Sequence, residues 1–205
     1  MNRKIGSLGS VKNAIVGAIE ATGDFFNAAV DTVSDALSGI IEGGEKTGLT
    51  LVEAISEIVR ATLHGAFEIG ADLGLTARGV VLGVLRTTGQ MGSEALQTIG
   101  HIAGAVVESV YQVGGDVGRA AKGAVEGAVH AARELSLDVE EAASVAANGA
   151  LTAAFRIGST VAQEVRDALK GTIEGVKVVF KEPFVKEVKR KRKTTKNIRY
   201  AGTRR

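Results

Sequence analysis

The sequence predicts an all-α protein made of long amphipathic helices, and three observations support this. The chain repeats itself every 22 residues, its apolar side chains recur with a matching 11-residue period, and it contains 27 Gly but a single Pro. Eleven residues make three helical turns at about 3.67 residues per turn, so such a period keeps the apolar side chains on one side of a helix. The alternation of apolar and polar residues that is typical of strands is absent.

Residues 1–13 are expected to form a short basic segment ahead of the repeats. The apolar stretch that follows is interrupted by Glu20 and Asp24, whereas a secretory signal needs an uninterrupted apolar region. The longest uncharged runs in the chain are too short for a membrane-spanning helix, which needs about 18 apolar residues. We therefore expect a cytoplasmic protein, either free or peripheral at a membrane or granule surface.

Residues 14–180 form an array of 22-residue units without gaps. Cut from Ala14, the chain divides into eight units, the last of which becomes irregular after about Val179. On a helix, the apolar positions of each unit share a face that is wider than the usual stripe. We expect the aliphatic residue at the sixth position of each unit to contact an apolar surface. These residues are Ile19, Ile41, Leu63, Leu85, Val107, Val129, Leu151 and Ile173.

Glycine recurs at fixed positions in the unit, which predicts close helix packing. Within a helix, glycine costs about 1 kcal/mol relative to alanine, so a solitary helix of this composition would be unstable and its apolar face must be covered. Small residues on a helix also allow a second backbone to approach closely. We expect this contact at the glycines of the thirteenth position, which are Gly48, Gly70, Gly92, Gly114 and Gly158.

The repeats are compatible with two arrangements. One continuous helix of about 165 residues would extend roughly 250 Å at 1.5 Å per residue. Folding back into two or more helical arms agrees equally well with the pattern. The glycine pairs Gly43-Gly44 and Gly114-Gly115 are the candidate bends in that case.

Residues 181–205 are expected to form a disordered basic tail. They hold eleven Lys or Arg and two Glu, a net charge of +9, whereas residues 1–180 hold 14 basic and 21 acidic residues, a net charge of −7. Pro183 marks the end of the repeats, because proline lacks a backbone N–H. The tail either is solvated or binds an anionic partner, which would be anionic lipid or nucleic acid. The side chains expected to bind that partner are Lys186, Lys189, Arg190, Lys191, Arg192, Lys193, Lys196 and Arg199.

No motif in the chain predicts catalysis, a cofactor or a metal site. Cysteine is absent, and the three histidines lack the spacing of metal ligands. The segment 39–47 departs from a phosphate-binding loop, because Glu45 separates Gly44 from Lys46 and no buried strand precedes it. We therefore expect no catalytic residues, no cofactor, no metal and no small-molecule substrate.

The 22-residue period resembles that of the exchangeable apolipoproteins, perilipins and synucleins, which coat lipid surfaces. The chain is also similar to the granule-coating phasins of bacteria, which are helical and amphipathic. The resemblance covers about residues 14–179 and lies in the period rather than in a motif. The array lacks the prolines that separate apolipoprotein repeats. The segment EKTGL at 45–49 matches the synuclein motif KTKEGV only in part. The resemblance implies a protein that coats an apolar surface.

Three functional hypotheses are open. In the first, the apolar face covers a membrane leaflet, a lipid droplet or a storage granule, and the basic tail binds an anionic partner. In the second, the glycine-notched helices pack on each other or on further copies of the chain, which gives a structural bundle or filament. In the third, the tail associates with nucleic acid.

Overall fold

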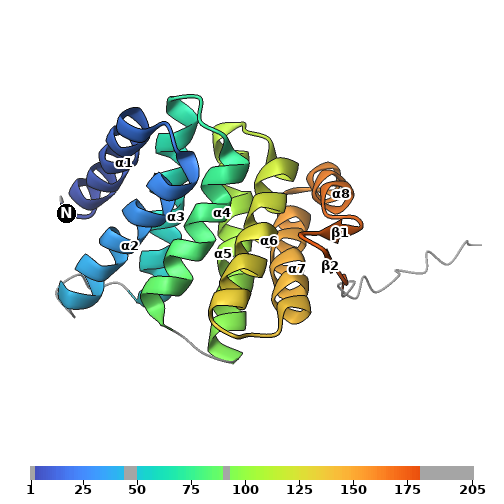
Figure 1. Ribbon diagram of the computed structural model, residues 1–205. Coiled ribbons are helices and arrows are strands. Elements are labelled where there is room, and N and C mark those ends of the chain that lie inside the picture. The colour runs from blue at the N-terminus through green and yellow to red at the C-terminus, as the bar shows by residue number, and fades with distance from the viewer. Residues whose placement is uncertain (1–2, 44–49, 90–92, 181–205) are drawn as a thin grey trace, which may run out of the picture.

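The computed structural model describes residues 3–43, 50–89 and 93–180, which form eight helices and one small hairpin (Figure 1). The helical segments are folded back on each other, as one of the two predicted arrangements requires, and no single extended helix is formed. The elements are α1 (Arg3–Thr22), α2 (Phe25–Gly43), α3 (Leu51–Glu68), α4 (Leu73–Thr88), α5 (Ser93–Val113), α6 (Val117–Glu134), α7 (Val139–Ile157), α8 (Ser159–Ala168), β1 (Thr172–Ile173) and β2 (Val176–Lys177).

The helices lie in two layers, because each helix from α1 to α7 packs mainly against the next helix but one. We call α1, α3, α5 and α7 the odd layer, and α2, α4, α6 and α8 the even layer. Figure 1 shows α2, α4 and α6 side by side, with α3 and α5 behind them. Neighbours within a layer are parallel: along α4, Gly79 meets Phe26 of α2, and Gly83 meets Val30 one turn later.

One 22-residue unit corresponds to one helix and one turn. At the end of α3, Gly70 has a positive φ of 69°, which glycine adopts without strain. The N–H of Ala71 then donates to the carbonyl oxygen of Ala66 at 2.9 Å and closes the helix end. Asp72 begins the next helix by accepting a hydrogen bond of 2.9 Å from the N–H of Gly74.

The same turn recurs along the chain. Gly114 has a φ of 75°, and Asp116 accepts from the N–H of Arg119 at 2.7 Å. Ser136 takes the place of the glycine in the following turn with a φ of 56°, and Asp138 caps α7. These aspartates cap the helix starts. The predicted bend at Gly114-Gly115 is confirmed.

The glycines that permit close helix contact are different from those predicted. A Cβ atom at Gly127 of α6 would lie 2.5 Å from the carbonyl oxygen of Arg78 in α4, and one at Gly83 would lie 2.8 Å from that of Val30. Gly79, Gly123 and Gly149 meet the backbone of a neighbouring helix in the same way. By contrast, a Cβ atom at Gly70, Gly114 or Gly158 would meet no atom within 4 Å, because these three residues lie at helix ends. Gly48 and Gly92 lie outside the described residues.

The core lies between the two layers. Seven of the eight aliphatic residues at the sixth position are buried there, with exposures of 5% or less, and Ile41 near the end of α2 is the exception at 49%. The layers can approach each other closely because α6 and α7 contribute mainly alanines, such as Ala124, Ala128, Ala143 and Ala147. In this fold the apolar face is therefore covered by other helices of the same chain.

The two ends of the predicted array differ from expectation. α1 is continuous from Arg3 to Thr22, so the boundary expected at residue 13 falls inside a helix. At the other end, the eighth unit forms a hairpin in which Thr172 pairs with Lys177 and Ile173 with Val176. The hairpin contacts α6 and α7, where a further helix of the stack would otherwise lie. None of the helices in the described ranges combines the length and apolar character that crossing a bilayer requires.

Candidate binding groove

A groove follows α5 along the outer face of the odd layer. Its main part is a hollow of about 450 Å³. Gly100, Gly104 and Gly149 lie along it, where missing side chains let α5 and α7 approach each other and leave the surface hollow. The walls are mostly polar: Ser56, Arg60, His101, Glu108, Ser109, Gln112, Asn148, Thr152 and Arg156 line them.

A second hollow continues this groove toward the start of α5. Its volume is about 370 Å³, and it shares His101 with the first. Together the hollows reach from Glu94 to Gln112 along α5, which is about 27 Å at 1.5 Å per helical residue. An extended polypeptide rises about 3.3 Å per residue, so this length matches roughly eight residues.

Ser56 and His101 contact each other in the groove. The Ser56 Oγ lies 2.8 Å from His101 Nε2 and 2.9 Å from the carbonyl oxygen of Val52. A hydroxyl has a single hydrogen, so Ser56 donates either to Val52 or to His101, and the tautomer of the imidazole decides between them.

The helices around the groove are strongly acidic. α3, α5 and α7 together contain seven Glu and two Arg, a net charge of −5, whereas α4 and α6 of the other layer contain five basic and two acidic residues, a net charge of +3. Both arginines are paired: Arg156 Nη1 lies 3.5 Å from Glu108 Oε1, and Arg60 Nη2 lies 3.6 Å from Glu57 Oε1. Burial, together with the charge of Arg60, lowers the pKa of His64 on α3, so this imidazole adds little positive charge at neutral pH.

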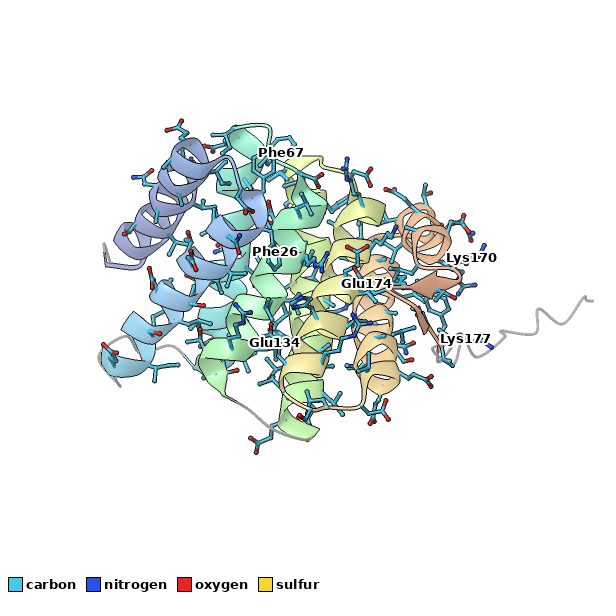
Figure 2. All side chains as sticks on the ribbon, in the orientation of Figure 1. Phe26, Phe67, Glu134, Lys170, Glu174 and Lys177 are labelled. Carbon is cyan, nitrogen blue, oxygen red and sulfur yellow. The ribbon has the colours of Figure 1, made fainter. Side chains whose placement is uncertain are left out.

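Charged side chains of the even layer form ion pairs with one another. Arg86 of α4 forms two hydrogen bonds to the Glu134 carboxylate, of 2.8 and 2.7 Å. Glu174 in the hairpin turn lies 3.5 Å from Arg78 and 3.8 Å from Arg133. Figure 2 shows Glu134 and Glu174 on this face. These ion pairs join α4 to α6 and hold the hairpin against them, which accounts for much of the charge on that side.

Next to the groove, side chains of α7 bind the backbone of the chain that follows the hairpin. The N–H of Val179 donates to Ser144 Oγ at 3.3 Å, and the carbonyl oxygen of Val179 accepts from Asn148 Nδ2, also at 3.3 Å. Both hydrogen-bonding groups of one peptide residue are thus satisfied by side chains of α7. Asn148 also lines the groove, so the chain after the hairpin lies at the groove's edge.

The odd layer also carries a regular row of exposed aromatic residues. Phe67, Tyr111 and Phe155 lie 44 residues apart near the ends of α3, α5 and α7, with exposures of 41%, 50% and 38%. Figure 2 labels Phe67 where α3 ends. Tyr111 and Phe155 directly precede Gln112 and Arg156, which line the groove. Aromatic residues are enriched among those that dominate binding interfaces.

The structure does not bring the sequence-predicted residues together as one site. The sixth-position aliphatics lie along the core, and the thirteenth-position glycines that are described lie in turns. The basic tail residues lie outside the described part of the chain. Within the described ranges, no three His, Asp or Glu side chains gather as metal ligands.

The groove residues were missed because a 22-residue period mixes the two layers. A period of 44 separates them, and it aligns Arg60, Gly104 and Asn148 in one row across α3, α5 and α7. Ser56, Gly100 and Ser144 form the next row. Glycine in the middle helix with polar residues on both sides is the signal that would have predicted a groove.

Comparisons with protein-family models, with curated proteins and with solved structures found no match for this chain.

Proposed function

We propose that this protein is a non-enzymatic helical scaffold that binds an extended, basic polypeptide segment in the groove of the odd layer. The observation that carries the proposal is the hydrogen bonding of Val179, whose backbone N–H and carbonyl oxygen are bound by Ser144 and Asn148. Protein side chains that hydrogen-bond to the backbone of a peptide can bind an extended peptide of any sequence.

The helices that form the groove favour positive charge through their excess of carboxylates, whereas the charged residues of the lining itself, Arg60, Arg156, Glu94 and Glu108, are balanced. The surrounding helices carry seven Glu and two Arg, and both arginines already have carboxylate partners. Complementary charge speeds association and rejects partners of the wrong sign more than it adds affinity. The charge of the surrounding helices therefore favours a Lys- or Arg-rich peptide over an acidic one.

The hypotheses in which the apolar face coats a lipid or granule surface require a change in the fold. Leu63, Leu85 and Val107 are fully buried between the layers. Coating a lipid or granule surface with these side chains requires the layers to separate first. A binding groove requires no such change, because its lining residues are already at the surface.

The test uses synthetic eight-residue peptides with a fluorescent label. We expect an Arg- and Lys-rich peptide to bind the full chain at low salt, and a Glu-rich peptide of equal length not to bind. Thr152→Trp fills the groove from an exposed position on α7 and should weaken binding at least about tenfold, a change of about 1.4 kcal/mol. Equal binding of both peptides contradicts the proposal.

The matched control is Lys122→Trp, which adds the same side chain at an exposed position on α6 of the other layer. We expect peptide binding by this variant to remain at the wild-type level. Circular dichroism of both variants checks that the helices are retained. Equal loss of binding in the two variants shows that the groove is not the site.

A further inference from the structure

We infer that the groove is occupied by the C-terminal segment of the same chain, residues 181–205, which an external peptide must displace. This inference rests on the proposed function, because it names an occupant for the same groove. Residues 181–205 lie outside the described residues, so the inference depends on where the described chain ends and on what surrounds that point.

The described chain ends beside the groove. Val179 is bound to Ser144 and Asn148 on α7, and Phe180 is the last described residue. The Asn148 amide contacts Val179 on one side and lines the groove on the other. A chain that crosses the outer face of α7 from this point enters the groove above α5.

The length of the remaining segment suits the groove. Twenty-five residues follow Phe180, and at about 3.3 Å per extended residue they reach roughly 80 Å. The groove takes about 27 Å of this. Because α7 is about 10 Å wide, crossing it uses roughly three residues. The dense basic run at 186–193 then falls along α5.

Charge directs the segment to this face of the molecule. The segment has a net charge of +9. The helices α3, α5 and α7 carry a net charge of −5, whereas the four helices of the even layer together carry −1, because α2 and α8 offset the +3 of α4 and α6. The tail is therefore attracted more strongly to α3, α5 and α7 than to the even layer. Attraction between exposed charges is screened by salt, with a Debye length of about 10 Å at 0.1 M and 3 Å at 1 M.

Tethering gives the tail an advantage over any free peptide. A segment joined to the groove by a short linker has an effective concentration in the millimolar range. A basic peptide from another protein must overcome this competition.

The experiment measures the distance from the tail to the groove in the full chain. The protein contains no cysteine, so two introduced cysteines can be spin-labelled without removing native ones. Thr152→Cys places one label in the groove, and Lys191→Cys places the other in the tail. The control pair combines Lys191→Cys with Lys122→Cys on α6.

We expect the groove pair to give a short, narrow distance distribution at low salt, and the control pair to give a longer one. The short component should disappear at about 1 M salt. It should also weaken by at least half when Glu94→Gln and Glu141→Gln remove two exposed charges from the odd layer. Indistinguishable broad distributions for the two pairs overturn the inference.

Dilution with unlabelled protein separates the segment of the same chain from that of a second copy. A distance within one chain survives dilution, whereas loss of the short component assigns the occupant to another molecule and overturns the inference. Peptide binding measured on the same variants distinguishes a failure of this inference from a failure of the proposed function. Binding of the basic peptide without a short tail distance leaves the proposed function standing, and absence of both results contradicts both proposals.

Discussion

Glycine has two distinct roles among the residues of this chain. At Gly127 and Gly149, the missing side chain lets two helix backbones approach within a layer. At Gly70 and Gly114, glycine instead adopts the positive φ that ends a helix. Gly39, in α2, belongs to neither group, because a Cβ atom there would meet no atom within 4 Å.

Replacing Gly127 and Gly39 by alanine should change stability in opposite directions. In Gly127→Ala the new Cβ would lie 2.5 Å from the carbonyl oxygen of Arg78, so α4 and α6 must shift, and we expect a loss of about 1–3 kcal/mol. In Gly39→Ala the Cβ enters open space within a helix, and we expect a gain of about 1 kcal/mol. Urea unfolding measures both free energies. Stabilisation by both substitutions would contradict the close contact.

Ser136 is a position where the turn sequence is not optimal. It has a φ of 56° where the equivalent turns have Gly70 and Gly114, and a side-chain-bearing residue in this conformation costs about 1–2 kcal/mol. Ser136→Gly should therefore raise the free energy of unfolding by about 1 kcal/mol. Gly114→Ala should lower it by a similar amount. A destabilised Ser136→Gly variant would show that the hydroxyl contributes more than the backbone conformation costs.

At the scale of elements, the sequence predicted helices but not where they end. The period of 22 is the length of one helix plus one turn, but its regularity is equally compatible with an uninterrupted helix. Two local signals mark the turns: a glycine at the thirteenth position and, two residues later, a capping residue such as Asp72 or Asp116. Taken alone, the glycine predicted a position of close helix packing. Taken together with the capping residue, it marks a helix end followed by a helix start.

The contact between α4 and α6 should weaken in acid. The hydrogen bonds from Arg86 lower the pKa of Glu134 below its ordinary value of 4.5. A carboxylate whose pKa is lower in the folded state stabilises the fold above its unfolded pKa, and this contribution is lost as the pH falls through the folded pKa. The loss therefore begins below about pH 4.5 and, because the pair is partly exposed, amounts to about 1 kcal/mol or less.

Glu134→Gln tests this assignment by chemical denaturation over the acidic range. The variant should be less stable than the wild type near neutral pH, and the difference should shrink below pH 4.5, the ordinary pKa of this carboxyl. Glu20→Gln on α1 is the control, because Glu20 is exposed and forms no ion pair within the described residues. If the difference in stability between Glu134→Gln and the wild type does not change with pH, the ion pair is not its cause.

At the scale of the whole molecule, the arrangement depends on contacts that a single period does not reveal. Each helix packs on the next but one, so the relevant neighbours are about 44 to 53 residues apart, as Gly83 and Val30 are. The broad apolar face is explained by this arrangement, because a helix in the array contacts both its own layer and the other layer. The groove arises in the same way, from small residues on α5 between larger polar residues on α3 and α7.

A lipid titration distinguishes a closed, two-layer molecule from a protein that opens to coat a surface. The closed fold requires full helicity in buffer, and its buried sixth-position aliphatics leave no broad apolar face for lipid. We therefore expect the far-ultraviolet circular dichroism and the sedimentation of the full chain to remain unchanged with neutral vesicles or an oil emulsion. Anionic vesicles can bind the basic tail, and in that case sedimentation should change in a salt-dependent manner while helicity does not. A rise in helicity on contact with neutral lipid would instead favour the surface coat, because it requires helices that form only when the apolar face is covered.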